Sequence, residues 1–484
     1  MSVNVFKAGY LPGLNESEVT YQRLQLGTSQ APLWVDVPEL SPAQMTALAQ
    51  RVRQASQTQL KTMPVSDIVR VLEQATARLL DSHDPVRQQL DQLLPQVTGF
   101  DPEMVRLNLT AYLQTFRGLQ LHRFVAEDFA NPKVLDEFQP RVQGGWTKAL
   151  GPDLLVHVWA GNVPALPMWS FVSGLLVKAG SIGKVASAEP VFATLLARLL
   201  AEIEPRWRDC FAVLWWPSVA TECTAFSLAD VVVAYGGNDA IRAMQRQVPV
   251  TTRFLPHGHK LSFGMVSAAA LTVRKGLHVA QQAAHDVVRY DQQGCYSPHM
   301  FYVQRGGPIS PQEFAQHLAH ELASLQHKLP RRTLSLEEAA QIKAWREAHV
   351  MASFQDPTLC VLGDEASPHT VVFSERCIPL APGPLNRCVT VVAVDALDEV
   401  IPMISPQRDH LQTVGVAAAP EELLSLGERL GQAGVTRICA LGAMTSPEAG
   451  WHHDGRFSLL DLVRMVDIEA STELQAAQFT SYEV

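Results

Sequence analysis

Cys295 stands in the stretch RYDQQGCYSPHMFYV, residues 289–303, between a polar turn that contains Gly294 and a run of strand-forming residues. A free cysteine is most often a small buried residue of the core. Because glycine lets the backbone come close to a bound molecule, the same stretch also allows Cys295 to act as a nucleophile. The stretch alone does not decide between these interpretations, so the other parts of a site are needed.

Asn162 lies in WAGNVP, in the turn after the first strand predicted beyond residue 150. Its side-chain amide could donate a hydrogen bond to an oxygen that gains negative charge during a reaction. The alternative is that Asn162 caps a helix beginning near Pro164, a position where asparagine is common. Taken by itself, the capping interpretation is favoured.

Two further positions have a chemistry typical of nucleotide binding. Lys184, in SIGKVAS, ends the second predicted strand and could contact a ribose or phosphate, or reach water from the sheet edge. Gly236 and Gly237 open a predicted helix, where backbone N–H groups can bind phosphate closely. The GxGxxG spacing of dinucleotide-binding turns is missing, so this signal is weak.

The pattern of strands and helices places these residues in an α/β architecture. From about residue 153, short apolar runs alternate with helical stretches, which is typical of a parallel sheet covered on both faces. Ligands of such sheets bind at the carboxyl ends of the strands. Residues 41–116 are predicted to be helical, and a second α/β unit is predicted from about residue 256. The tail is predicted to add a strand at 434–442 and a helix within 451–469.

Composition limits the class of protein. The 484 residues are 47% hydrophobic and 18% charged, with a formal net charge of −9, which predicts a globular chain of more than one domain. No basic run stands out, so nucleic acid is not an expected partner. The seven cysteines show no zinc or redox spacing, and free thiols in a reducing cytoplasm fit them best. The N-terminus lacks a signal-peptide pattern, which also favours the cytoplasm.

One apolar segment has about the length of a membrane span. Residues 158–177 contain no charge, but Asn162, Pro164 and Pro167 favour a turn that leads into a buried helix. We therefore expect no membrane span.

Five segments, taken together, resemble the aldehyde dehydrogenase superfamily in order and approximate spacing: GNVP, GKVAS, AYGGND, HGHKLSFGMVS and QQGCYSPHMFYV. More closely, they resemble its LuxC-type acyl-CoA reductases, which make fatty aldehydes in bioluminescent bacteria. The resemblance covers residues 150–305 well and includes HHDG and LVRMVD in the tail, while the N-terminal helices match loosely. It implies two doubly wound α/β domains with a helical N-terminal region. The expected boundaries are 1–255 for the helical region and dinucleotide-binding domain, 256–440 for the catalytic domain, and 441–484 for a segment that packs back on the body.

The resemblance implies a role for each candidate residue. Cys295 matches the nucleophile, and Asn162 matches the asparagine that forms the oxyanion hole with the Cys295 N–H. Lys184 matches the lysine that holds the adenosine ribose. Gly236 and Gly237 match the turn that meets the pyrophosphate.

Two departures from the superfamily pattern bear on the reaction. Oxidising members carry a glutamate base four residues before the lysine of ELGGK, where PHGHK places Pro256. An enzyme that keeps an acyl thioester until hydride arrives gains nothing from a base that activates water. Ser187 stands where NAD-selective relatives often have a glutamate, whose charge would repel a 2′-phosphate. NADPH is therefore the expected cofactor, and NADH the less favoured one.

The resulting prediction is NADPH-dependent reduction of a fatty acyl-CoA or other acyl thioester to the aldehyde, through an acyl-Cys295 intermediate. The alternatives are an oxidising aldehyde dehydrogenase and a cysteine acyl carrier or structural subunit without redox activity. Expected partners are the acyl-CoA or acyl-protein substrate, acyl-transferase or synthetase proteins, and further copies of the chain. Trp169 and Phe171 either line a tunnel for the acyl chain or pack in the core, which is the commoner role of such residues.

Other polar residues are expected to have no direct role. The WHHDG stretch at 451–455 is interpreted as a loop, since adjacent residues rarely converge on one metal ion, and no metal is expected. Glu375 does not align with the nicotinamide motif of the superfamily. Four histidines near the site in sequence are interpreted as surface or core residues, although the second could help to orient the cofactor: His257, His259, His285 and His299.

Overall fold

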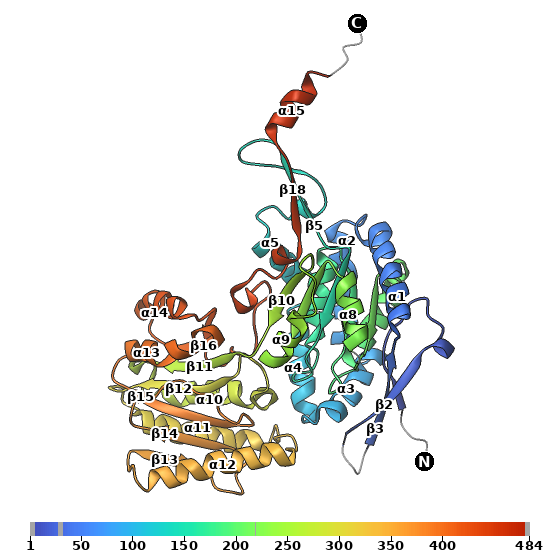
Figure 1. The fold of residues 1–484 in the computed structure, drawn as a ribbon. Coiled ribbons are helices and arrows are strands. Elements are labelled where there is room, and N and C mark those ends of the chain that lie inside the picture. Colours follow the sequence, from blue (N-terminus) through green and yellow to red (C-terminus); the bar gives the residue numbers. More distant parts are fainter. Residues whose placement is uncertain (1–4, 28–31, 218, 480–484) are drawn as a thin grey trace. The chain divides into compact units, whose positions relative to one another are not determined.

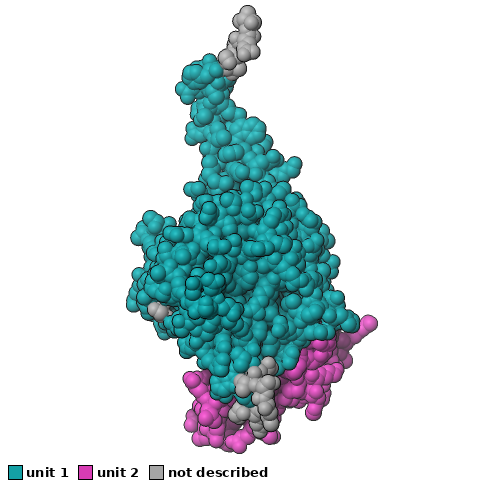
Figure 2. Space-filling model, turned by 90° about the vertical axis from the view of Figure 1, so that its right-hand side faces the viewer, with its two compact units in different colours: residues 1–98, 109–258, 448–484 teal, residues 99–108, 259–447 magenta. Residues whose placement is uncertain are grey.

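The computed structural model describes residues 5–27, 32–217 and 219–479 (Figure 1). The chain divides into two compact units, which Figure 2 colours separately. Unit 1 contains residues 1–98, 109–258 and 448–484, and unit 2 contains residues 99–108 and 259–447. The division of cofactor binding and catalysis between domains stays a prediction.

Unit 1 is built around a parallel sheet with the strand order β10-β9-β6-β7-β8 (Figure 1). Almost every residue of its inner strands is buried, which explains why these segments read as unbroken apolar runs. The alternation of strands and helices predicted from residue 153 is confirmed. The strands are β6 (Leu154–Val158), β7 (Gly180–Lys184), β8 (Phe211–Leu214), β9 (Val231–Tyr235) and β10 (Arg253–His257). The helices between them are α6 (Pro167–Leu176), α7 (Phe192–Ile203), α8 (Val219–Leu228) and α9 (Asn238–Gln245).

The N-terminal helices are also confirmed, and α1 shows how sequence sets a helix start. Ser41 accepts a hydrogen bond from the Gln44 N–H, and the Gln44 side chain accepts one from the Ser41 N–H, which together satisfy two backbone donors. The helices are α1 (Pro42–Ala55), α2 (Val65–Leu80), α3 (Pro85–Thr98), α4 (Pro102–Gln114) and α5 (Gly118–Asp128). A small sheet precedes them that the sequence analysis did not predict: β1 (Val5–Lys7), β2 (Thr20–Gly27) and β3 (Pro32–Glu39).

The tail of unit 1 corrects one prediction. The helix expected within residues 451–469 is wrong, because β18 (Arg464–Ile468) pairs antiparallel with β5 (Trp146–Leu150). Strand β4 (Gln139–Pro140) completes this three-stranded sheet, and a short helix, α15 (Ala470–Ala477), follows β18. Pairing with a distant strand here overrides the local sequence pattern.

Unit 2 contains a seven-stranded sheet with the order β13-β14-β15-β12-β11-β16-β17, parallel except for the edge strand β13. The α/β pattern predicted after residue 256 is confirmed at the level of strands and helices. The strands are β11 (Leu261–Val266), β12 (Pro298–Gln304), β13 (Leu359–Leu362), β14 (Thr370–Ser374), β15 (Cys388–Val394), β16 (Leu411–Ala417) and β17 (Arg437–Ala440). The helices are α10 (Gly276–Val288), α11 (Pro311–Gln326), α12 (Leu336–Ser353), α13 (Val400–Ile404) and α14 (Pro420–Ala433).

No helix in the described part of the chain has the length and apolar character that a membrane crossing needs. The uncharged segment 158–177 forms the end of β6, a turn and α6. All ten residues of α6 are buried within the protein.

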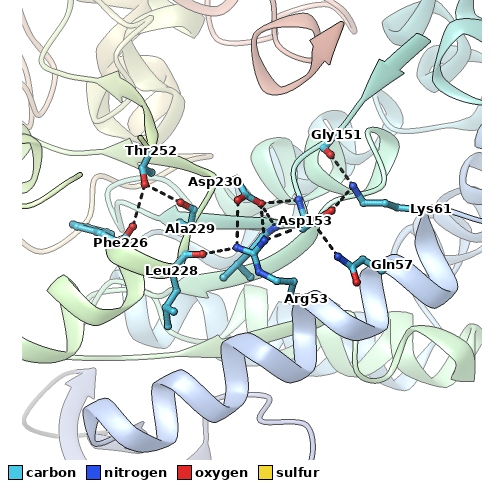
Figure 3. A network of polar contacts seen from close by, with 11 residues as sticks. Arg53, Gln57, Lys61, Gly151, Asp153, Phe226, Leu228, Ala229, Asp230 and Thr252 are labelled. Atoms are coloured by element: carbon cyan, nitrogen blue, oxygen red, sulfur yellow. Dashed lines mark hydrogen bonds and ion pairs between the residues drawn. The ribbon is translucent and has the colours of Figure 1, made fainter. Parts of the chain in front are cut away.

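A network of charged side chains joins α1 to the amino ends of β6 and β9 (Figure 3). Asp230 accepts hydrogen bonds from the backbone N–H groups of Asp153 and Leu154, at 2.8 and 2.9 Å. Arg53 of α1 lies 3.3 Å from Asp230, and Lys61 lies 2.6 Å from Asp153. These contacts pair the two carboxylates that stand immediately before the strands.

Candidate active site

The carboxyl ends of the five parallel strands in unit 1 form one edge, which we call the carboxyl edge. Val158 lies opposite Lys184 and Ala234, and Tyr235 lies opposite His257, so the strands end at nearly the same level. Residues that follow such strands share the position where α/β sheets bind ligands. The candidate residues of unit 1 all stand at or just after this edge: Asn162, Lys184, Ser187, Gly236 and Gly237.

Asn162 lies in an exposed bend between β6 and α6. The helix begins at Pro167 with Leu166 as its N-cap, and not near Pro164. The interpretation of Asn162 as the helix cap is therefore wrong. Its proposed role as an amide donor stays a prediction.

Lys184 is the last residue of β7 and Ser187 follows the strand. Both contact side chains that come after β8 in the chain. The Lys184 ammonium lies 3.7 Å from a carboxylate oxygen of Glu222 and 5.7 Å from the ring centre of Trp216. The Ser187 hydroxyl accepts a hydrogen bond of 2.9 Å from the Trp215 indole. A serine hydroxyl bound in this way still carries a hydrogen that it can donate to a ligand.

Gly236 and Gly237 leave space at the start of α9. Gly237 is the N-cap of the helix, and a Cβ added to it would meet no atom within 4 Å. A Cβ on Gly236 would meet only Ala240, at 3.6 Å. The Gly236 N–H already donates to the His257 carbonyl, at 3.1 Å, so a phosphate here would be bound by N–H groups at the start of α9 itself. The space left by the two glycines fits the pyrophosphate of a dinucleotide, the group that the fold family implies.

A partly open pocket lies at the carboxyl edge. Apolar side chains make part of its wall: Trp169, Val233, Leu255, Phe457 and Leu462. Polar side chains make the rest: Ser170, Ser173, Tyr235, His257, His453, Arg456, Ser458 and Asp461. Trp169 thus lines a pocket, whereas Phe171 is buried in the core against Phe211, with ring centres 5.3 Å apart.

His257, at the end of β10, pairs with Asp454 in the tail. Its Nδ1 lies 2.7 Å from the Asp454 carboxylate, and the two side chains are only 13% and 7% exposed. The His257 ring stacks between Tyr235 and His453, with ring centres 4.6 and 4.4 Å away and planes within 14° of parallel. The sequence analysis missed this arrangement. The HHDG segment in the tail was its one visible signal.

His257, His453 and Asp454 are also residue types that can bind a metal ion, so their geometry must be compared with that of a metal site. Ligand atoms of His257, His453 and Asp454 lie within 4.8 Å of one another. The lone pair of an imidazole nitrogen lies in the ring plane, so a metal ion must lie in the plane of each ring that binds it. Two rings stacked at 4.4 Å have separate, nearly parallel planes that do not meet at one ion. The geometry favours a hydrogen-bonded pair over a metal site.

Cys295 lies in unit 2, in the turn immediately before β12, and its side chain is partly exposed. The Ser262 hydroxyl of β11 donates a hydrogen bond of 2.7 Å to the Cys295 carbonyl. The Ser297 N–H donates to the Gly294 carbonyl at 3.0 Å and closes the turn. Cys295 is thus not a sealed core residue, and a hydrogen bond from β11 holds its backbone.

Strained backbone precedes the cysteine. Residues 290–292 have φ values of 49, 48 and 65°, in the left-handed region that residues other than glycine rarely adopt. Residues 385–387 share this conformation, with φ values of 62, 54 and 70°. Asp291 and Arg387 join the two segments through an ion pair of 2.7 Å in which both side chains are fully buried.

Gln292 extends this connection to both sides of Cys295. Its side-chain oxygen accepts hydrogen bonds from the N–H groups of Arg387 and Cys388, at 2.6 and 3.0 Å. Its side-chain nitrogen donates to the Pro298 carbonyl, at 2.8 Å. The turn that carries Cys295 is therefore tied to β15 and to the start of β12.

The remaining candidates in unit 2 have structural partners. The His299 Nδ1 accepts a hydrogen bond of 3.1 Å from the Gly383 N–H, and burial lowers the pKa of His299 to about 4. Burial also lowers the pKa values of His259 and His285. Glu375 pairs with Arg305 at 3.0 Å. The interpretation of His299 as a satisfied core residue is confirmed.

Comparison with solved structures shows which fold this protein has. Aldehyde dehydrogenase 21 from Physcomitrella patens superposes with a TM-score of 0.73, over 97% of this chain and 99% of its own, at 13% identity. The NADP-dependent glyceraldehyde-3-phosphate dehydrogenase from Bacillus halodurans gives 0.72 over 96% and 99%, at 12% identity. At such identities the likeness establishes the fold alone, which is that of the aldehyde dehydrogenases, as predicted.

The family follows from the sequence. The acyl-CoA reductase (LuxC) family matches residues 60–465, and this chain belongs to that family. It is 29% identical to the long-chain acyl-protein thioester reductase of Aliivibrio fischeri over 380 residues, 77% of this chain and 75% of the relative. It is 26% identical to that of Vibrio harveyi over 417 residues, 85% and 84% of the two chains. The protein is accordingly an oxidoreductase of the acyl-reductase type, which confirms the resemblance seen in the motifs.

Proposed function

We propose that this protein reduces a long-chain acyl thioester to its aldehyde through an acyl group on Cys295, with NADPH as the reductant. The observation that carries the proposal is the family match over residues 60–465. The end of β10 supports it, because Pro256 occupies the position where oxidising relatives have a water-activating glutamate.

In the proposed mechanism the Cys295 thiolate attacks the carbonyl carbon of the thioester, and the carrier leaves as a thiolate. The Asn162 amide and the Cys295 N–H donate hydrogen bonds to the oxyanion of each tetrahedral intermediate. One such donor lowers the barrier by about 3 kcal/mol. After reduction, the thiohemiacetal anion collapses to aldehyde and regenerates the Cys295 thiolate, a step that needs no base.

Four residues of unit 1 would hold the cofactor. Gly236 and Gly237 would bind the pyrophosphate, while Lys184 and Ser187 would bind the adenosine ribose and its 2′-phosphate. Bound NADPH supplies the hydride. Glu222 acts against this preference, because its carboxylate lies 3.7 Å from the Lys184 ammonium and repels a phosphate nearby. NADH is thus the cofactor to compare with NADPH.

The acyl chain is proposed to enter the pocket at the carboxyl edge, where Trp169 and Phe457 offer apolar surface. The named relatives act on acyl-protein thioesters, and we extend that substrate to this chain together with acyl-CoA. Acyl-transferase or synthetase partners, self-association and a cytoplasmic location complete the proposal.

Intact-protein mass spectrometry tests this function. Wild-type protein incubated with acyl-CoAs of graded length should gain the mass of one acyl group, and Cys295→Ala should gain none. Adding NADPH should remove the acyl mass and release aldehyde. An adduct on Cys295→Ala would refute the nucleophile. Production of reduced cofactor from aldehyde without a thiol would indicate an oxidising enzyme, and failure to bind either cofactor would indicate an acyl carrier.

A further inference from the structure

Residues 290–292, shortly before Cys295, form a left-handed turn that contains no glycine. Their φ values of 49, 48 and 65° lie in a region where the Cβ atom crowds the backbone, so this turn raises the energy of the folded chain. Such backbone persists only where surrounding contacts hold it, and it is found most often at functional sites. The contacts that hold this turn therefore indicate its role.

A buried ion pair fixes the middle of the turn. Asp291 and Arg387 are both fully buried, and every nitrogen of the Arg387 guanidinium has an acceptor. Nε donates to Asp291 at 2.7 Å, Nη1 donates to the Gln326 side chain at 2.8 Å, and Nη2 donates to the Leu329 carbonyl at 2.7 Å. The guanidinium cannot leave this position without leaving a buried charge unpaired.

Gln292 extends this restraint to the segment that contains Cys295. Its side chain is 1% exposed, and its oxygen accepts hydrogen bonds from the N–H groups of Arg387 and Cys388. Its nitrogen donates to the Cys388 carbonyl at 3.2 Å and to the Pro298 carbonyl at 2.8 Å. The side chain thus joins a residue before Cys295 to a residue after it, and closes the segment between them into a short loop.

A connection between α10 and β12 does not by itself require such a turn. Ordinary turn residues make connections of this kind without left-handed backbone at three successive positions. The proposed reaction does require a fixed loop, because the Cys295 N–H is a proposed donor to the oxyanion. A donor lowers the barrier only when it is held in the direction in which the charge develops.

We propose that Gln292, held in place by the Asp291–Arg387 pair, is a positioning residue that orients the Cys295 N–H toward the oxyanion of the acyl intermediates. The proposal rests on the proposed function, and all of its residues belong to unit 2. The three side chains take no part in bond making or proton transfer, since they act only through the backbone of Cys295.

The test compares two reactions of the same thiol. Attack on an acyl-CoA places negative charge on an oxygen and uses the Cys295 N–H, whereas alkylation by iodoacetamide expels iodide and forms no oxyanion. Both reactions use the thiolate, so the ratio of their rates at one pH does not depend on the pKa of Cys295. Peptide mass spectrometry of the full chain, without cofactor, follows both products at Cys295.

Gln292→Met keeps an unbranched side chain of similar length and removes its hydrogen bonds to the backbone. We expect acylation to slow about 10- to 100-fold and alkylation to stay within about threefold of wild type. Tyr302→Phe is the matched control, because it removes a hydrogen bond of 3.0 Å from β12 to the Ile378 carbonyl and leaves the turn intact. Its ratio of the two rates should equal that of wild type.

A double variant keeps the proposal testable if Gln292→Met does not fold. Asp291→Asn combined with Arg387→Met leaves no buried charge without a partner. Asparagine also tolerates the left-handed φ of 48° at position 291. The double variant should show the same selective loss of acylation.

An unchanged ratio in these variants, whether both reactions slow or neither does, would overturn the positioning role. A selective loss of acylation in Tyr302→Phe would also overturn it, because any disturbance of unit 2 would then have the same effect. If wild-type Cys295 is alkylated but not acylated, the proposed function itself fails, which is a different outcome from failure of Gln292 alone.

Discussion

At the amino edge of the five-stranded sheet, charged side chains neutralise one another, while at the carboxyl edge polar side chains surround a pocket. Asp153 and Asp230 stand before their strands and are paired with Lys61 and Arg53 of the N-terminal helices (Figure 3). His257 stands at the other end of the same sheet and faces empty space. The charged groups of the amino edge bind one another and stabilise the fold, whereas the polar groups of the carboxyl edge line a pocket and can contact a ligand.

This difference separates stability from activity within one sheet. Removing a group of the amino edge leaves its partners without their hydrogen bonds. The free energy of unfolding should therefore decrease. Removing a group of the carboxyl edge that contacts a ligand should lower a rate and leave unfolding nearly unchanged. The following experiments test that separation in order of the expected effect.

Asn162→Ala should have the largest effect of these substitutions, and it should change the rate of acyl-Cys295 formation without changing stability. Losing one amide donor to the oxyanion should slow acyl-Cys295 formation about 100- to 1,000-fold. Because Asn162 is exposed and does not cap α6, the melting temperature should stay within about 1 °C of wild type. Stopped-flow acylation and thermal unfolding check the two halves. A normal rate, or a large drop in melting temperature, would contradict the distinction between the edges.

Glu189→Gln should change the stability of the protein and its pH dependence, because Glu189 has a structural role although it lies near the carboxyl edge. Burial raises the pKa of Glu189 to about 7, although its side chain accepts hydrogen bonds from the N–H groups of Val191 and Phe192 at the start of α7. The folded state therefore binds this proton more tightly than the unfolded state, and stability declines as the pH rises from about 4.5 through 7.

Glutamine keeps the accepting oxygen and cannot ionise. The variant should gain stability over wild type as the pH rises from 5 to 8, on the order of 3 kcal/mol, while the rates stay similar. Thermal unfolding of both proteins across this range measures the gain. Asp286 of unit 2, whose pKa burial also raises to about 7, should leave a residual decline in the variant. Parallel stability curves for the two proteins would refute the assignment.

Asp230→Ala should lower stability without lowering the rate. The change leaves the N–H groups of Asp153 and Leu154 without an acceptor and Arg53 without one of its partners, at a cost of about 1–3 kcal/mol. Denaturant unfolding measures the cost. The acylation rate per folded molecule should equal that of wild type. A large loss of rate would show that the amino edge also affects catalysis, which would contradict the separation of the two edges.

Glu222→Gln should have the smallest effect, on cofactor preference. Glutamine can still accept the hydrogen bond that the Trp216 indole donates to Glu222 at 3.0 Å, but it carries no charge. The ratio of NADPH to NADH affinity should rise a few-fold, or ~1 kcal/mol, as expected for a partly exposed charge. Fluorescence titration with both cofactors checks this, and an unchanged ratio would place the 2′-phosphate away from Glu222.

The regular part of the fold could be predicted because its signals are local. Unbroken apolar runs such as Leu154–Val158 and Val231–Tyr235 indicate buried parallel strands wherever they occur. Residues 464–468 carry no such signal, since they are partly exposed and become a strand only by pairing with Trp146–Leu150. The turn at Tyr290–Gln292 lacks the glycine or asparagine that usually marks left-handed backbone.

The candidate residues divide in the same way. Cys295 and Asn162 could be found because motifs around them resemble a known family. His257 and Asp454 are 197 positions apart, and no local pattern tells that they meet. Ser187 could be singled out because NAD-selective relatives often have a glutamate at this position. The carboxylate of Glu222, which lies 3.7 Å from the Lys184 ammonium, could be recognised only in the folded structure.

Part of the wall of the pocket in unit 1 comes from residues that the ribosome adds only after unit 2. The five-stranded sheet of unit 1 is complete by His257, yet His453, Arg456 and Phe457 belong to a segment synthesised after the whole of unit 2. A chain cut short before residue 453 would contain the thiol but lack the residues that close this pocket. Translation order thus delays assembly of the pocket until all of unit 2 has been synthesised.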